Sequence, residues 1–216
     1  MGRKTKIPIS SIIKDFDVVA LSELHTKSNI SIPGFHLKKQ KFRPKAHKGP
    51  KIGGGIAVYL NQEVASNFRL IPNNNVDSIW IKTSLGLGEG ELRLGFYYCS
   101  PERKGSNNFD TVVDEINKMN NNKNTYIFGD FNARIKTVCE NIVQDKTDET
   151  LGIQTVIETL PPPRNSEDQK LVNKRGQEFL DLCRVNDLTI ANGRVTVTCM
   201  ENILVIKRKD QVWLIT

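Results

Sequence analysis

Five short apolar runs are the feature that most constrains how this chain can fold. They are DFDVVALSE (15–23), GGGIAVYL (53–60), DSIWIKTS (77–84), ELRLGFYYC (91–99) and NTYIFGD (124–130). Each is bounded by polar, Gly, Asn or Pro residues, and such partly β-branched runs are typical of strands buried within a sheet. We therefore expect these segments to share sheets.

A helical period replaces this pattern in two segments, 107–122 and 173–188. The apolar residues that recur there are Phe109, Val112, Val113, Ile116 and Met119 in the first segment and Phe179, Leu180 and Cys183 in the second. The spacing predicts two amphipathic helices that pack on a sheet, and LTIANG (188–193) predicts one further strand. Strands interleaved with helices indicate the α/β or α+β class.

The length and composition suit one globular domain over residues 1–216. Hydrophobic residues make up 38% of the chain and charged residues 25%, which allows a sizeable core in a soluble protein. The polar stretch 136–170, which contains LPPPRNSED, predicts a long surface loop.

Cysteine usage and hydropathy exclude several classes of protein. The four cysteines are Cys99, Cys139, Cys183 and Cys199, and no C-x-x-C pair occurs among them. This spacing suggests neither a zinc site nor a disulfide framework. No run reaches the roughly eighteen apolar residues of a membrane span, and residues 1–17 lack the apolar block of a signal peptide. We expect an intracellular protein, nuclear or cytoplasmic, that does not enter a membrane.

The run TYIFGDFNAR places a carboxylate and an amide directly after a strand. If the backbone stays extended, Asp130 and Asn132 lie on one face about 6–7 Å apart. Asp130 could then bind a cation or accept a proton, while Asn132 offers both a donor and an acceptor. Gly129 would let backbone approach a ligand closely. The alternative is an ordinary Asp, Asn and Gly turn that closes a strand.

Several motifs in order along the chain carry a resemblance. GDFNAR is preceded by SELHT at the end of the first strand, by GGGIAVYL, and by FYYCSP at the end of another strand. Together they resemble the endonuclease/exonuclease/phosphatase superfamily. The run RNSEDQKLVNKRGQEFLDLCRVNDLTIANGR (164–194) resembles the apurinic-like endonuclease domain of LINE-type, non-LTR retrotransposons.

This resemblance implies a fold and an activity. The fold is a four-layered α/β sandwich, with two mainly antiparallel sheets flanked by helices and a site on one edge. The activity is hydrolysis of DNA phosphodiesters assisted by Mg²⁺ or Mn²⁺. By position, Glu23 resembles the metal-binding glutamate and Tyr98 the tyrosine near the scissile phosphate. Asp130 resembles the aspartate that activates water, and Asn132 its phosphate-orienting partner.

The chain also departs from the family pattern. Residues 1–17 contain no asparagine, whereas relatives carry one on a first strand. Relatives also close with an Asp-His pair, but His25, His36 and His47 all precede GDFN. Against that pattern we expect a sandwich that is incomplete at both ends, a divergent tail over 195–216, and impaired activity.

A basic stretch, HLKKQKFRPKAHKGPK (36–51), holds seven of the lysines and arginines of a chain whose formal net charge is +7. Its first five cationic residues, Lys38, Lys39, Lys41, Arg43 and Lys45, are candidates for binding nucleic acid. The alternative is a solvated lysine-rich loop.

Three functions remain open at this point. The first is a metal-dependent DNA endonuclease domain derived from a retrotransposon. The second is a non-catalytic relic of that domain that binds nucleic acid. The third is a phosphatase of the same superfamily, since fold does not fix substrate.

Overall fold

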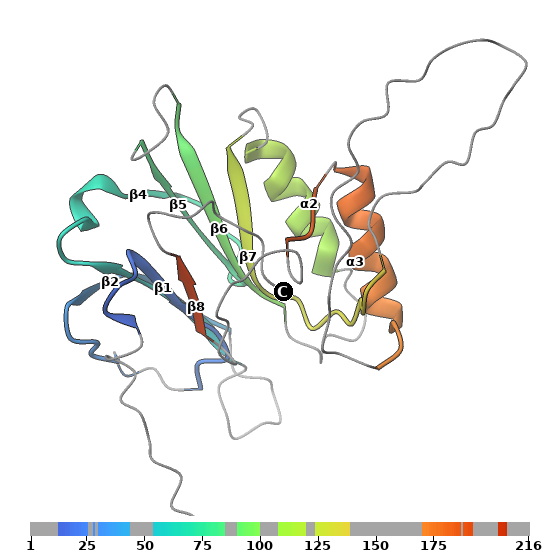
Figure 1. Ribbon diagram of the computed structural model, residues 1–216, viewed down its shortest axis with the longest axis horizontal. Coiled ribbons are helices and arrows are strands. Elements are labelled where there is room, and N and C mark those ends of the chain that lie inside the picture. The colour runs from blue at the N-terminus through green and yellow to red at the C-terminus, as the bar shows by residue number, and fades with distance from the viewer. Residues whose placement is uncertain are drawn as a thin grey trace, which may run out of the picture.

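The computed structural model describes residues 13–25, 28, 30–43, 54–84, 90–99, 108–119, 124–138, 170–186, 188–191 and 203–206. These residues form two four-stranded sheets (Figure 1). The first sheet has the order β2 (Phe35–Phe42), β3 (Gly55–Asn61), β1 (Val18–Leu21) and β8 (Ile203–Ile206). The second has the order β4 (Arg69–Ile71), β5 (Ser78–Thr83), β6 (Leu92–Tyr98) and β7 (Thr125–Asp130).

Strand direction is antiparallel throughout the first sheet, whereas the second ends in a parallel pair, β6 with β7. In the chain, the helix α2 (Asn108–Met119) comes after β6 and before β7, and α3 (Lys174–Val185) comes after β7. A short 3₁₀ helix, η1 (Ala65–Asn67), precedes β4. Neither α-helix is long and apolar enough to cross a membrane, and no other helix in the described ranges is.

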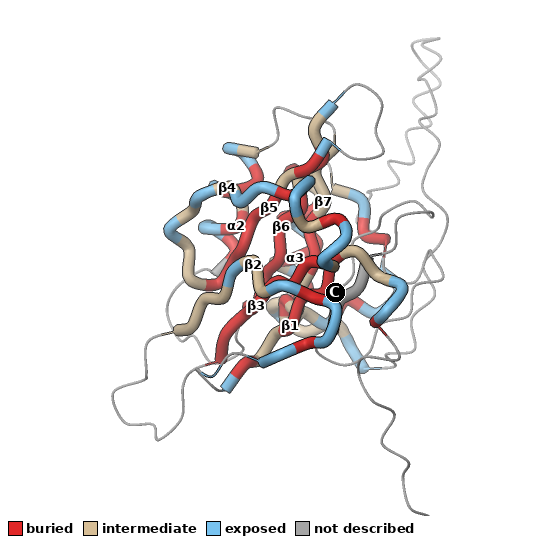
Figure 2. Tube along the Cα trace, turned by 90° about the vertical axis from the view of Figure 1, so that its left-hand side faces the viewer, coloured by how far each residue is buried: buried red, intermediate tan, exposed pale blue. Residues whose placement is uncertain are grey.

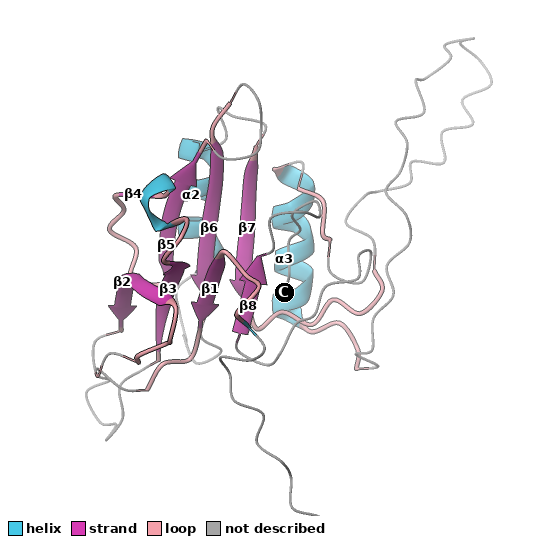
Figure 3. Ribbon diagram, turned by 60° about the vertical axis from the view of Figure 1, so that its left-hand side comes forward, coloured by secondary structure: helices cyan, strands magenta, loops and turns pink. Residues whose placement is uncertain are grey.

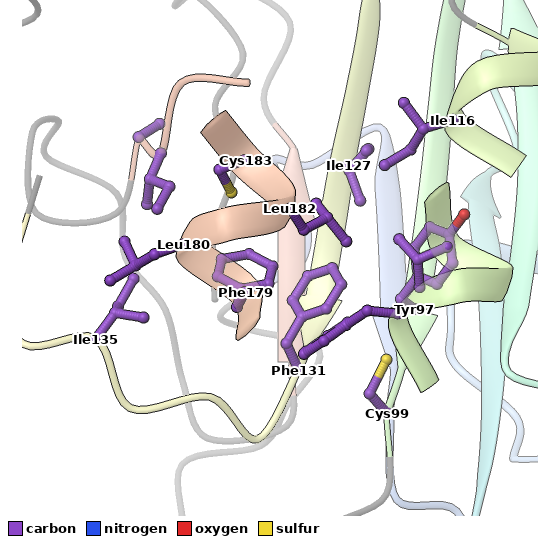
Figure 4. Close-up of a cluster of buried hydrophobic side chains, with 14 of the residues drawn as sticks. Tyr97, Cys99, Ile116, Ile127, Phe131, Ile135, Phe179, Leu180, Leu182 and Cys183 are labelled. Atoms are coloured by element: carbon purple, nitrogen blue, oxygen red, sulfur yellow. The ribbon is translucent and has the colours of Figure 1, made fainter. Parts of the chain in front are cut away.

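Both helices cover the same face of the β4–β7 sheet, the face that points away from the first sheet (Figures 1 and 3). Their apolar stripes meet that sheet in one core, where Phe131 stacks against Tyr97 and packs on Phe179 with ring centroids 4.7 Å apart (Figure 4). The predicted α+β sandwich is thereby confirmed. Among the described residues both α-helices lie on the second sheet, so the fourth of the four layers that the resemblance implies stays a prediction.

A second core fills the space between the two sheets. Val18, Val58 and Leu60 of the first sheet pack there against strands of the second, on which Phe96 and Phe128 stack with ring centroids 5.5 Å apart. Buried residues run along the centre of both sheets (Figure 2). The strands thus have buried faces on two sides, which explains their continuous apolar runs.

The five predicted strands and both predicted helices are confirmed; β3 extends one residue beyond its predicted run, and the other elements are shorter than predicted. The predicted strand over 188–193 is wrong for residues 188–191, which form no strand and instead place Ile190 and Ala191 in the helix–sheet core. The predicted loop over 136–170 is described only at 136–138 and 170, where no helix or strand forms. In the divergent tail, β8 pairs with β1.

In the basic stretch, residues 36–42 belong to the strand β2, so the alternative of a solvated loop is wrong for its first half. Two features hide this strand. It lies at the sheet edge, where lysines are common because they discourage pairing with other chains. A register shift between Leu37 and Lys39 also breaks the alternation of buried and exposed residues.

A buried carboxylate ties α2 to the second sheet. Glu115 is 8% exposed and accepts hydrogen bonds from five side chains. The donors are Tyr97 Oη (2.7 Å), Ser78 Oγ (2.7 Å), Trp80 Nε1 (3.3 Å), Asn73 Nδ2 (2.8 Å) and Asn75 Nδ2 (3.3 Å). Lys41 of β2 then donates to Asn73 Oδ1 and to the carbonyls of Asn73 and Asn75. The polar 73–75 turn therefore links both sheets and the helix.

Candidate active site

Three strand ends, those of β1, β6 and β7, bring the predicted site residues to one edge of the sandwich. Because β6 and β7 are parallel, they end at the same edge, and Tyr98 lies directly opposite Asp130 in the register. The Cys99 amide extends the pairing by donating to the Asp130 carbonyl at 2.8 Å. Glu23, just beyond β1, accepts a hydrogen bond from the Tyr98 hydroxyl at 3.2 Å. Residues far apart in the sequence therefore meet at one edge.

Glu23 occupies a strained backbone conformation. Its φ of 56° lies in the left-handed region, which is unusual for a residue other than glycine. The chain is held there by its neighbours, since the Leu24 amide donates to the Gly55 carbonyl at 3.1 Å. Strain of this kind clusters at functional sites because the surrounding structure imposes it.

Asp130 and Asn132 form a closed hydrogen-bonded turn instead of an extended pair. The Asn132 amide donates to Asp130 Oδ1 at 2.8 Å, and Asn132 Nδ2 donates to Asp130 Oδ2 at 3.1 Å and to the Cys99 carbonyl at 3.0 Å. Asn132 has a φ of 51°. The expectation of extended backbone was thus wrong and the turn alternative was right about the local geometry. The turn nevertheless fixes both oxygens of the Asp130 carboxylate.

Gly129 is required by the protein's own backbone. Its φ is 151°, and a Cβ built there would lie 2.0 Å from the Tyr97 carbonyl oxygen. The sequence suggested that this glycine admits a ligand. In the structure the neighbouring strand β6 occupies that space, so Gly129 allows β7 to deliver Asp130 opposite Tyr98.

Burial and neighbouring charge shift two pKa values upward. Burial raises the pKa of Asp130, hydrogen bonds from Asn132 oppose the rise, and the charge of Glu23 adds to it. For Tyr98, burial, the charge of Glu23 and the hydrogen bond to it raise the pKa to about 12. Asp130 is therefore a better proton acceptor than an exposed aspartate, and Tyr98 stays a neutral hydrogen-bond donor at physiological pH.

The donor set fits a hard divalent cation in its chemistry. The charge of Glu23 raises the pKa of both Asp130 and Tyr98, so negative charge is concentrated where a cation would be stabilised. In the described part of the chain no group of three or more His, Cys, Asp or Glu residues gathers. Mg²⁺ keeps several of its waters and needs only one or two carboxylates, so Glu23 and Asp130 at this edge are sufficient in number.

Most of the predicted nucleic-acid-binding residues have partners within the protein. Lys38 Nζ donates to the Phe68 carbonyl at 2.7 Å, Lys41 bonds the 73–75 turn, and Arg43 pairs with Asp77. Lys39 is exposed on β2. Lys45 lies outside the described residues. Nucleic-acid binding by this stretch stays a prediction, and Lys39 is its best-exposed described candidate.

Sequence reasoning missed the residues of α3 and its N-cap that hydrogen-bond the backbone just after Asn132 and Asp130. Arg175 Nε, in the first turn of α3, donates to the Phe131 carbonyl at 2.8 Å. Asn173, the N-cap of α3, accepts hydrogen bonds at Oδ1 from the Gly176 amide (2.7 Å) and the Arg134 amide (3.2 Å). The run NKRG just before an apolar helix is a capping signal that predicts the helix start, but it does not predict which loop the cap contacts.

No protein-family model matches this sequence, and no curated protein matches it significantly. The superfamily resemblance therefore stays a prediction, and the function has to be argued from the geometry of the site.

Replacing Glu23 with glycine is expected to leave the free energy of unfolding equal to or up to about 1 kcal/mol above that of the native chain, because glycine adopts positive φ without strain. Glu23→Ala, which loses the same carboxylate but keeps a Cβ, should be less stable than Glu23→Gly. Urea unfolding of the two variants measures the difference. If alanine were the more stable of the two, the backbone at this position would not be strained.

Proposed function

We propose that this chain is a divalent-metal-dependent phosphodiesterase acting on DNA, of the endonuclease type carried by non-LTR retrotransposons. The observation that carries the proposal is the convergence of Glu23, Tyr98, Asp130 and Asn132 at one sheet edge. Two carboxylates, a neutral phenol and an amide are the groups that phosphodiester hydrolysis by water requires.

Asp130 is the group placed to take a proton from the attacking water. Its raised pKa favours proton acceptance, and the two hydrogen bonds from Asn132 hold its carboxylate in one orientation. The proposed role of Asn132 is to orient Asp130, because its Nδ2 donates to that carboxylate and to the Cys99 carbonyl. Its contact with a phosphate oxygen stays a prediction.

In this proposal Tyr98 donates its one hydroxyl proton to a phosphate oxygen, which requires it to leave the hydrogen bond with Glu23. A phenol with a pKa of about 12 keeps its proton throughout the physiological range. Glu23, with Asp130 at the same edge, would hold Mg²⁺ or Mn²⁺. When bound, such an ion supplies positive charge against the negative charge that develops on the phosphate oxygens.

The activity test is nicking of supercoiled plasmid in Mg²⁺. We expect Asp130→Ala to lower the rate by at least about 10²-fold, since it removes a general base. Asp114→Ala is the matched control, because Asp114 is exposed on α2 and lies outside the site. Nicking that survives in Asp130→Ala at the rate of the control would contradict the proposed role.

The sequence itself favours a second candidate function, a folded relic that binds DNA without cutting it. All three histidines precede GDFN, whereas the resembled family carries a histidine in an Asp-His pair after that motif. Loss of one preorganised electrostatic group costs about 10²- to 10³-fold in rate. Absence of nicking by folded protein, together with salt-dependent DNA binding, would select this second function.

DNA binding is expected to involve Lys39. Removing one phosphate contact makes the negative slope of log K against log salt shallower by about 0.9 for duplex DNA. Lys39→Gln should show this change, whereas Lys118→Gln, an exposed lysine on α2, should not. Fluorescence anisotropy with a labelled duplex at several salt concentrations measures both slopes. Equal slopes for the two variants would indicate that Lys39 is simply solvated.

A further inference from the structure

We propose that the ion pair between Arg43 and Asp77 is a positioning device that fixes the Tyr98 side chain in the site. Both residues contact Tyr98, and both would act on the reaction through it. The role in catalysis rests on the proposed phosphodiesterase function, whereas the fixing of Tyr98 is a property of the fold that can be tested by itself.

Arg43 reaches the site from the first sheet. It directly follows β2, and its side chain is 9% exposed, as is that of Asp77 just before β5. Arg43 Nε donates to Asp77 Oδ1 at 2.6 Å, and Arg43 Nη2 donates to the Tyr98 carbonyl at 2.7 Å. A guanidinium is a planar fork with donors in fixed directions, so two such bonds determine its orientation.

The same guanidinium lies over the Tyr98 ring, with its central carbon 4.9 Å from the ring centroid. Gly54 also lies against this ring, because a Cβ placed on it would be 2.6 Å from Tyr98 Cε1. The Tyr98 amide donates to the Asp77 carbonyl at 2.9 Å. The ion pair and Gly54 therefore hold both the main chain and the ring of Tyr98. In this position the Tyr98 hydroxyl points to Glu23.

Energetics support a positioning role over a purely stabilising one. A buried ion pair loses the hydration of both charges, so its net contribution to stability is small, but removal of one partner leaves a buried charge. The pair also joins the two sheets at the edge where the site forms. Arg43 donates to both Asp77 and Tyr98. A lysine could not form both bonds in these fixed directions, which explains why this position in a lysine-rich stretch is an arginine.

The test uses the four tyrosines of the chain as reporters. Ring ¹³C–¹H signals of Tyr98 are assigned with Tyr98→Phe, then followed in Arg43→Gln, Arg43→Lys and Asp77→Asn. Arg69→Gln is the matched control, since Arg69 is exposed on β4. Plasmid nicking gives kcat and KM for the same proteins, and circular dichroism verifies that each is folded.

We expect the Tyr98 ring signal to shift in Arg43→Gln and Asp77→Asn but not in Arg69→Gln. If the native chain nicks DNA, kcat should fall by about 10²-fold with KM nearly unchanged, because a displaced group misaligns the reaction. Arg43→Lys should not restore kcat, since an ammonium lacks the planar fork.

Three results would overturn the proposal. They are an unchanged Tyr98 signal in both folded variants, a rise in KM without loss of kcat, and full recovery of kcat by lysine, which would make Arg43 a simple phosphate-binding charge. If the native chain does not nick DNA, the proposed function fails. The ring signals then decide by themselves whether the pair fixes Tyr98. Asp77→Asn keeps the test valid if Arg43→Gln does not fold.

Discussion

Replacement of Gly129 by alanine is expected to lower the free energy of unfolding by about 3–5 kcal/mol, because a close contact and an unfavourable φ act together. The new Cβ would lie 2.0 Å from the Tyr97 carbonyl oxygen and 2.9 Å from its nitrogen. These are backbone atoms of the paired strand, so neither can rotate away as a side chain would. The parallel pair of β6 and β7 has to separate locally.

Gly34→Ala is the control that isolates the conformational part of this cost. Gly34 also has a positive φ, 81°, but nothing lies within 4 Å of the Cβ that alanine would add. Its variant should lose only about 1 kcal/mol, the cost of left-handed backbone. Urea unfolding of both variants gives the comparison. Equal losses would show that β6 yields easily and that the contact at Gly129 is unimportant.

Loss of the Glu115 carboxylate is the second change with a large expected effect. Glu115→Ala should lower the free energy of unfolding by about 3–5 kcal/mol, as for other buried networks that lose their central charge. The hydroxyls of Tyr97 and Ser78 and the indole N–H of Trp80 would lose their acceptor inside the protein. Glu178→Ala, in α3, is a control because that side chain is 41% exposed. A loss at Glu115 no larger than at Glu178 would mean that water replaces the carboxylate.

The contribution of the Glu115 network to the free energy of unfolding should depend on pH in acid. Burial raises the pKa of Glu115, but its hydrogen bonds, that from Asn73 foremost, lower it by more, so the folded-state pKa lies below the usual value. Such a group contributes stability that is fully present above its unfolded pKa of about 4.3 and is lost as pH falls through the folded value. The stability difference between the native chain and Glu115→Gln should therefore be constant near neutral pH and shrink in acid below that range.

The sequence predicts the parts of the fold that are determined locally. Runs such as those around Val58, Trp80 and Phe96 are buried on both faces, so their apolar character needs no knowledge of partners. The helical stripe of Phe109 and Ile116 is equally local. In contrast, the formation of β2 depends on pairing with β3 and on a bulge, and that of β8 depends on pairing with β1. The residues of these two strands are therefore not enough to predict them.

The candidate site divides in the same way. Glu23, Tyr98 and Asp130 could be predicted because each follows or ends an apolar strand in a known kind of motif. The Arg43–Asp77 pair could not, because its members are 34 residues apart and each is common in solvated loops. Even the geometry of Asn132 was misjudged, since one left-handed residue turns an extended pair into a closed turn.

Left-handed backbone at Glu23 also makes this position informative about the history of the chain. Folding alone would favour glycine there, because glycine adopts positive φ without strain. A lineage under no demand for the site's chemistry gains stability by a single substitution at Glu23, whereas it keeps Phe128 for packing and Asn132 for the hydrogen bonds that its side chain donates. Retention of Glu23 among descendants therefore measures selection for function, separately from selection for folding.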